Sequence, residues 1–156
     1  MLRISKLTDY GIMLLTHLAS GSTALTYSAG ELAARANLPL PTVSKLLKQL
    51  ARTGLLKTQR GVKGGFSLAR RPEDISVAEM IRALEGPIAV TECCILPHGQ
   101  CSLERHCPVG NHWQQINRAV QGALEGLTLA AMTRPFPSNS IFLRNPERQR
   151  TQRGEG

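Results

Sequence analysis

Residues 28–54 carry the clearest signals for the fold of this chain. They read S-A-G-E-L-A-A-R-A-N-L-P-L-P-T-V-S-K-L-L-K-Q-L-A-R-T-G. Ser28, with Glu31 three positions later, forms a capping box that starts a short helix. Pro41 suits the first position of a second helix, because its missing N–H would be unpaired there in any case. Gly54 ends that helix. The stretch therefore predicts two helices joined by a short, proline-containing turn.

The second predicted helix, over about 41–53, has two different faces. Its apolar residues recur at helical spacing and predict a buried stripe of Val43, Leu46, Leu47 and Leu50. Its other residues predict an exposed, partly basic face of Thr42, Ser44, Lys45, Lys48, Gln49 and Arg52. This layout is typical of a helix-turn-helix, whose second helix enters the DNA major groove. We expect Lys45 and Lys48 to hold phosphates, and Thr42 and Ser44 to lie near base edges.

A glycine-rich hairpin follows the second helix. Two short runs, 55–60 and 66–69, flank G-V-K-G-G and predict the strands of a wing. Arg60 and Lys63 stand near its tip, where they can reach phosphates or a narrow minor groove. A phosphate cradle for a nucleotide is an alternative interpretation, but the final glycine is not followed by Lys-Ser/Thr or directly by a helix.

Helices are also predicted on both sides of this module. Residues 8–20 carry an apolar stripe at helical spacing, with Thr8 as N-cap and Asp9 in the first turn. Ser76 opens a second capping box, and the helix that it starts ends at Gly86. Both helices present an apolar face that can join a common core.

A longer helix is predicted from about Val109 to Gly126, with a separate last turn over 128–132. Its apolar residues form an a/d seam of Trp113, Ile116, Val120, Ala123 and Leu127. The positions expected to face outward are Gln114, Gln115, Arg118, Gln121 and Glu125. Such a seam either packs on its own domain or pairs with a second copy. We favour a homodimer, because a small winged module needs two-fold symmetry to bind a palindromic site.

The charge distribution favours a polyanionic partner. The 156-residue chain has a formal net charge of +8, and residues 32–72 hold nine basic residues and no acidic one. A field of one sign at this density favours a double-stranded DNA operator, with a solvated basic face as the alternative interpretation. No apolar run is long enough to span a bilayer, and the N-terminus lacks a secretory signal. We expect neither a membrane nor a small-molecule substrate as partner.

All four cysteines, Cys93, Cys94, Cys101 and Cys107, fall in one loop that ends shortly before Trp113. In a reducing compartment such clusters are more often metal ligands or redox thiols than disulfides. Soft thiolates select zinc, copper(I) or iron–sulfur clusters. A structural zinc site is one possibility, with the ligands Cys94, Cys101, Cys107 and His112. An enzyme with a reactive cysteine is not expected, since no base and orienting group accompany the thiols.

The expected fold class is mainly α with a small β-hairpin, in which a winged helix-turn-helix is joined to a long dimerisation helix. We divide the chain into a DNA-binding domain over 1–86, a cysteine-rich metal-binding loop over 87–108 and a dimerisation helix over 109–133. Residues 134–156 contain Pro, Asn, Ser and several arginines, and are predicted to form a disordered basic tail.

Three pieces of the sequence together resemble one family. They are the opening M-L-R-I-S-K-L-T-D-Y-G, the wing R-G-V-K-G-G-F-S-L, and the cysteine loop followed by Trp113. In this order and spacing they resemble the Rrf2 family of bacterial winged helix-turn-helix regulators, over about residues 1–133. Within it, the chain is most similar to regulators of SUF iron–sulfur assembly, relatives of the IscR and NsrR types. The resemblance implies a cytoplasmic homodimer, bound at the nucleoid, that carries an iron–sulfur cluster.

The resemblance also implies which residues hold the cluster. Cys101 and Cys107 match the last two family cysteines, and the first ligand is Cys93 or Cys94, with Cys93 favoured because it follows Thr91-Glu92. A [2Fe–2S] cluster is favoured over [4Fe–4S], with zinc as the alternative. IscR-like members have a histidine three residues after the last cysteine, where this chain has Gly110. The remaining candidates for the fourth ligand are His112, two residues later, and Asp9 from the partner subunit, as in NsrR-like members.

The regulation implied by the resemblance is repression of iron–sulfur assembly genes while the cluster is present. Loss of the cluster would relieve it. The family wing arginine matches Arg60, which makes Arg60 the best candidate for a base contact. A nitric-oxide-sensing or redox-sensing member of the same family is the alternative.

Overall fold

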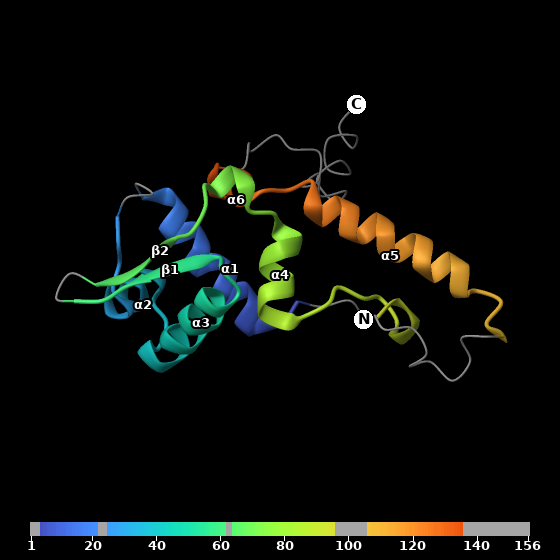
Figure 1. The fold of residues 1–156 in the computed structure, drawn as a ribbon, viewed down its shortest axis with the longest axis horizontal. Helices are drawn as coiled ribbons and strands as arrows, with labels where there is room; N and C mark the ends of the chain where they lie inside the picture. The colour runs from blue at the N-terminus through green and yellow to red at the C-terminus, as the bar shows by residue number, and fades with distance from the viewer. Residues whose placement is uncertain (1–3, 22–24, 62–63, 96–105, 136–156) are drawn as a thin grey trace, which may run out of the picture.

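The computed structural model describes residues 4–21, 25–61, 64–95 and 106–135. Within these ranges a helical module with a two-stranded hairpin lies at one end, and a long helix, α5, projects away from it (Figure 1). The expected class, mainly α with a small β-hairpin, is confirmed. Lys63, Cys101 and the predicted tail from residue 136 onward lie outside the described residues.

The first helix, α1, spans Lys6–Ser20 and begins earlier than expected. Ser5 is the N-cap, because its side chain accepts a hydrogen bond from the Thr8 backbone N–H at 3.2 Å. The prediction of Thr8 as N-cap was therefore wrong. Thr8 is instead the third helical residue and is buried, and its hydroxyl lies 3.1 Å from that of Ser5. Asp9 stands in the first turn, as predicted.

The helix-turn-helix consists of α2, Ala29–Ala36, and α3, Leu40–Arg52. Both halves of the capping box between Ser28 and Glu31 are present, as predicted. The buried residues of α3 are the four in the predicted stripe, and three of them, Val43, Leu47 and Leu50, are fully inaccessible to solvent. Helix α3 begins one residue before Pro41, which a proline in the first turn permits.

The wing is the antiparallel pair β1, Leu56–Gln59, and β2, Gly65–Leu68, in which Leu56 faces Leu68 and Gln59 faces Gly65. Tyr27 forms an isolated antiparallel bridge with Phe66 of β2. The Tyr27 N–H donates to the Phe66 carbonyl at 3.0 Å, and the Phe66 N–H donates back at 2.8 Å. The hairpin is thus attached to the segment that enters α2, so the wing and the helix-turn-helix form one surface.

A short 3-10 helix, η1 (Pro72–Asp74), leads into α4, Val77–Glu85. Ser76 caps α4 by accepting from the Glu79 N–H, as predicted. Gly86 ends α4 with φ of 94°, a conformation that favours glycine, and Pro87 cannot continue the helix. The chain therefore turns sharply at this point toward the cysteines.

Beyond Gly86 the chain forms the 3-10 helix η2, Glu92–Cys94, then α5, Gly110–Glu125, and α6, Leu129–Thr133. The predicted separate last turn is thus a short helix. Leu129 is fully buried, and its N–H donates to the Ile75 carbonyl at 2.8 Å, so α6 returns to the helical module. None of the helices in the described ranges has the length and apolar character needed to cross a membrane.

Candidate nucleic-acid interface and cysteine segment

The exposed face of α3 carries the residues predicted to contact DNA. Lys45 and Lys48 are exposed, while Thr42 and Ser44, nearer the start of the helix, are half-buried. Short polar side chains at the start of a recognition helix can approach base edges, and longer cationic ones beside them can reach phosphates. The assignment of these four residues to DNA contacts stays a prediction.

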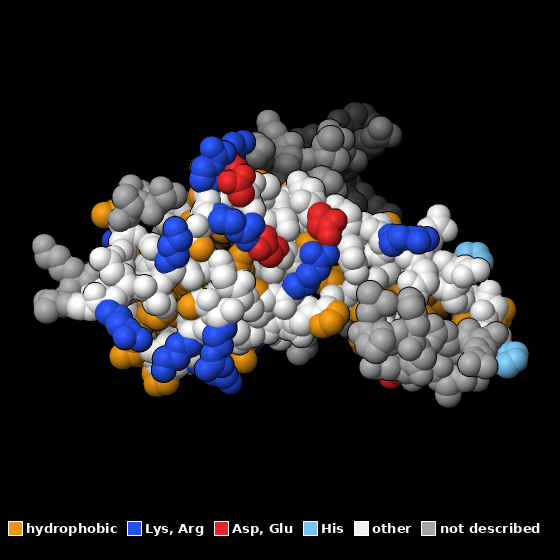
Figure 2. All heavy atoms as spheres, viewed as in Figure 1, with side chains coloured by type: hydrophobic (Ala, Val, Ile, Leu, Met, Phe, Trp, Pro, Cys, Tyr) orange, Lys and Arg blue, Asp and Glu red, His pale blue; other side chains and the backbone are white. Residues whose placement is uncertain are grey.

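The basic field predicted over 32–72 lies on the surface. Figure 2 shows Lys and Arg side chains gathered over the end of the molecule that carries α3 and the hairpin. Every one of these basic residues that the structure describes is exposed, namely Arg35, Lys45, Lys48, Arg52, Lys57, Arg60, Arg70 and Arg71.

Two of these cations already have acidic partners. Arg70 pairs with Glu79, and Arg71 lies 3.6 Å from Glu73 and 3.5 Å from Asp74. They are therefore less available to DNA than Arg60, which is exposed just beyond the end of β1, at the turn of the wing.

The described cysteines differ in exposure. Cys93 and Cys107 are half-buried, while Cys94 is buried and its thiol donates to the Trp113 carbonyl at 3.6 Å. The Thr91 hydroxyl lies 3.1 Å from the Cys93 sulfur and 3.3 Å from the Cys94 sulfur. Cys94 is thus engaged with α5, whereas the Cys93 sulfur is the more accessible of the two.

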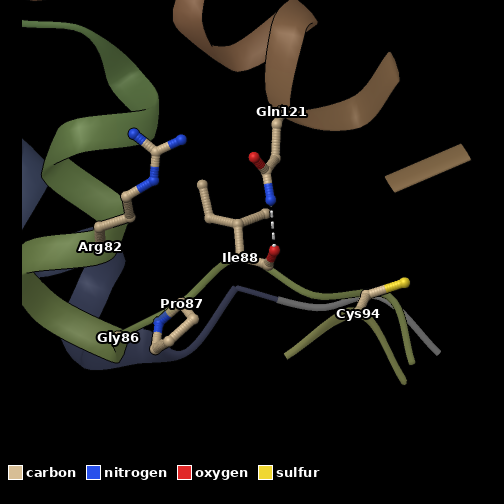
Figure 3. Close-up of a pocket in the computed structure, with 6 residues that line it drawn as sticks. All are labelled: Arg82, Gly86, Pro87, Ile88, Cys94 and Gln121. Atoms are coloured by element: carbon tan, nitrogen blue, oxygen red, sulfur yellow. Dashed lines mark hydrogen bonds between the residues drawn. The ribbon is translucent and has the colours of Figure 1, made fainter. Parts of the chain in front are cut away.

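A line of amide side chains on α5 binds the backbone of residues 87–94, which we call the strap. Gln121 donates to the Ile88 carbonyl at 2.8 Å (Figure 3), and Gln114 donates to the Cys93 carbonyl at 2.5 Å. Asn117, between them at helical spacing, accepts from the Val90 N–H at 3.1 Å and is buried. These three residues hold the strap against α5.

The prediction that Gln114 and Gln121 face outward was wrong, because both side chains turn toward the chain's own strap. Asn117 was not singled out from the sequence at all. The repeat of amide residues at 114, 117 and 121, with spacings of three and four, was the signal for a second, polar stripe on this helix.

A shallow hollow of about 420 Å³ lies where the strap passes between α4 and α5 (Figure 3). It is lined by Arg82, Gly86, Pro87, Ile88, Cys94 and Gln121. Arg82 also pairs with Glu125 at 2.5 Å, which fixes the C-terminal part of α5 to α4. Around the hollow, α5 is therefore bonded both to the strap and to α4.

The described donor atoms do not by themselves complete a metal site. Among the residues that the structure describes, no three His, Cys, Asp or Glu side chains lie together in a way that could hold a metal ion. Cys101, the middle predicted ligand, is outside the described ranges. Asp9 and His112 are both exposed, on α1 and α5 respectively. The thiols present are of the soft class that iron–sulfur clusters require.

Gly110 lies directly beside Cys107. A Cβ atom at Gly110 would stand 4.0 Å from the Cys107 sulfur, so the position where IscR-like members carry a histidine is adjacent to the last cysteine in this fold too. Glycine offers no donor atom there. Any fourth ligand in this chain must come from another residue.

One face of α5 is apolar and exposed. Trp113 is 38% exposed, Ile116 44% and Leu127, just beyond the helix, 53%. Large apolar side chains gathered on one face indicate an interaction surface. The seam predicted from the sequence is therefore uncovered in a single chain.

The family follows from comparison with known proteins. The sequence model of the Rrf2 family, described as an iron-dependent transcriptional regulator, matches residues 4–135. The chain belongs to the Rrf2 family. The regulator NsrR of Halalkalibacterium halodurans is 27% identical over 128 residues, which covers 82% of this chain and 88% of that protein.

Two solved structures share the fold at 30% sequence identity. CymR, the global cysteine regulator of B. subtilis, has a TM-score of 0.67 and covers 85% of this chain and 97% of its own. IscR of T. potens has a TM-score of 0.62, with 84% and 85% covered. The protein is therefore a DNA-binding transcriptional regulator. Its relatives are regulators and not enzymes, as predicted.

Proposed function

We propose that this Rrf2 protein is a homodimeric repressor whose affinity for its operator depends on an iron–sulfur cluster, and that it represses SUF iron–sulfur assembly genes in the bacterial cytoplasm. In this proposal residues 1–86 bind DNA, 87–108 hold the cluster and 109–133 dimerise. Cys93, Cys101 and Cys107 are the thiolate ligands, and [2Fe–2S] is the favoured form. The cluster, when bound, supplies sensitivity to iron and to oxidants.

The positions of Cys93 and Cys107 carry the proposal. The Cys93 backbone is bonded to Gln114, and the Cys107 side chain lies beside Gly110, so both cysteines stand at the N-terminal part of α5. Cys101 lies between them in sequence. The N-terminal end of a helix favours negative charge, which suits thiolates. A group held by these thiolates would adjoin the helix expected to form the dimer.

Cys93 is favoured over Cys94 as the first ligand. The Cys94 thiol is buried and donates to the Trp113 carbonyl, so using it as a ligand would break this hydrogen bond and expose a buried side chain. The Cys93 sulfur is half-buried and needs no such movement. The same observation argues against a structural zinc site built on Cys94.

Two candidates for the fourth ligand remain. Asp9 is exposed on the first turn of α1 and can serve a partner subunit, and His112 is exposed on the first turn of α5. A carboxylate is harder than a thiolate and binds iron less tightly, which suits a sensor that must release its cluster. We favour Asp9, because Gly110 removes the histidine that IscR-like members use.

A continuous set of contacts connects the cysteine segment to the DNA-binding module. The strap is bonded to α5 through Gln114, Asn117 and Gln121, and it continues through Gly86 into α4, which packs on the helix-turn-helix. A metal bound by the cysteines would therefore add a further link between the strap and α5, beside the DNA-binding module. The separation of two recognition helices, and hence the fit to one operator, would change with it.

Anaerobic purification tests the proposal. The protein should contain iron and acid-labile sulfide, with visible absorption that disappears on chelation. Its affinity for an operator, selected from a random duplex pool by the wild-type protein, should then fall at least about tenfold, within the usual range of allosteric coupling. A colourless, zinc-loaded protein that binds its operator tightly would contradict the proposal.

A further inference from the structure

The last turn of α4 is bonded to the recognition helix through one side chain. Gln49 of α3 donates its amide Nε2 to the carbonyl of Ala83 at 3.0 Å and to that of Leu84 at 2.9 Å. The sequence placed Gln49 on the exposed face of α3, and that prediction was wrong, because the side chain is half-buried and directed at α4. Its amide is therefore not available for contact with DNA.

The carbonyls of Ala83 and Leu84 can accept these hydrogen bonds because they lie in the last turn of α4. The last four carbonyls of a helix have no partner within the helix, and Gly86 with Pro87 prevents another turn from supplying one. Gln49 satisfies two of these acceptors at once, from a residue 34 and 35 positions away in sequence. One amide thus joins α3 to the point where the chain leaves α4 for the strap.

The same turn is also fixed to α1. The Ser5 N–H donates to the Glu85 carboxylate at 2.7 Å. Leu84 packs against Gly11, where an added Cβ would lie 2.6 Å from the Leu84 Cδ1 atom, so a larger residue would make the Leu84 side chain shift. The turn that leads into the strap is therefore bonded to both α1 and α3.

We infer that Gln49 is a positioning residue that couples the position of the strap to the orientation of the recognition helix. This inference rests on the proposed function, because it assigns the route by which the cysteine segment affects DNA binding. Gln49 itself touches neither DNA nor metal. Its two hydrogen bonds make the last turn of α4 and the C-terminal half of α3 move together.

The test compares operator affinity with and without the cluster in Gln49→Met, which keeps the side-chain length but removes both donors. In this variant the ratio of the two affinities should fall to within about twofold of one, while iron and sulfide content stay at the wild-type level. Gln49→Lys restores a donor that suits a helix C-terminus and should recover much of the ratio. Its added charge raises both affinities alike and cancels in the ratio.

Gln115→Met is the matched control, since Gln115 is exposed on α5 and the same chemical change there should leave the ratio unchanged. A wild-type ratio retained in Gln49→Met would overturn the inference and leave the proposed function intact. A wild-type protein whose affinity ignores the cluster would overturn both.

Hydrogen–deuterium exchange of the wild-type protein tests the same inference without any variant. Cluster loading should slow exchange in the last turn of α4 and in the second half of α3 together. Protection of residues near the cysteines with none in α3 would overturn the inference, even if Gln49→Met failed to fold.

Discussion

The winged module and α5 are built in opposite ways. Leu14, Leu32 and Leu47 of the module are fully buried, and their helices pack on one another within a single chain. Among the sixteen described residues of α5 the only buried one is Asn117, which is polar, while Trp113 and Ile116 are exposed. The module buries its apolar side chains within a single chain. Helix α5 binds the strap through amide side chains and leaves Trp113 and Ile116 exposed to solvent.

The largest effect is expected from placing a charge in that apolar face. Ile116→Glu should dissociate the dimer, because each buried isoleucine contributes about 1.5–3 kcal/mol and a symmetric dimer buries it twice. The dimer dissociation constant should rise by about 100-fold or more. Sedimentation equilibrium measures this directly, and operator affinity should fall with it.

The matched control for this change is Arg118→Glu, at an exposed polar position of the same helix. It should leave the dimer intact. If Ile116→Glu remained a dimer with full operator affinity, the apolar face of α5 would not form the dimer interface.

The next largest effect is a difference in metal content between variants of the two adjacent cysteines, Cys93 and Cys94. Cys93→Ser should lower iron and sulfide content by tenfold or more, because a serine hydroxyl does not replace a soft thiolate. Cys94→Ser should keep its iron, since this side chain bonds to the Trp113 carbonyl and a hydroxyl can still donate there. Metal analysis of both variants, purified in parallel without oxygen, gives the answer. The reverse result would show that Cys94, and not Cys93, is the first ligand.

A smaller effect is expected on the DNA side. Lys48→Ala removes one exposed cation of α3, so the slope of log affinity against log salt should flatten by about one unit with no change in sequence preference. Binding titrations at several salt concentrations measure the slope, and a second selection from the random pool measures preference. A changed preference with an unchanged slope would assign Lys48 to base reading.

The smallest effect concerns the contact between α1 and α4. Hydrogen bonds from the Thr8 hydroxyl, and from the backbone and side chain of Ser5, lower the pKa of Glu85. A carboxylate with a lowered folded-state pKa adds stability above its unfolded value, and this is lost as pH falls through the folded value, below about pH 4.5.

Glu85→Gln should therefore lower the melting temperature slightly at pH 7 and make it less dependent on pH below 4.5. Thermal melts of both proteins across pH 3–7 measure this, where the effect of an exposed group should be about 1 kcal/mol or less. Identical pH profiles would show that Glu85 does not stabilise the joint between α1 and α4.

The module could be predicted from sequence because its determinants are local. The stripe on α3 and the capping box at Ser28 each depend on residues within one or two turns. Gln49, Gln114 and Gln121 could not be assigned this way, since their partners lie 21 to 35 positions away. A polar residue on a helix is expected to face water unless its distant partner is known. For the same reason, the hydrogen bond between the Ser5 N–H and the Glu85 carboxylate, 80 positions apart, was not predicted from the sequence.

The most direct test of the central claim is operator affinity measured alongside iron and sulfide content in Cys101→Ser and Cys107→Ser, with the wild-type protein in cluster-loaded and cluster-free forms. We predict that both variants lose the cluster and bind the operator only as weakly as cluster-free wild type. If both variants kept wild-type iron and wild-type operator affinity, the cysteines would not control DNA binding, and the account would be contradicted.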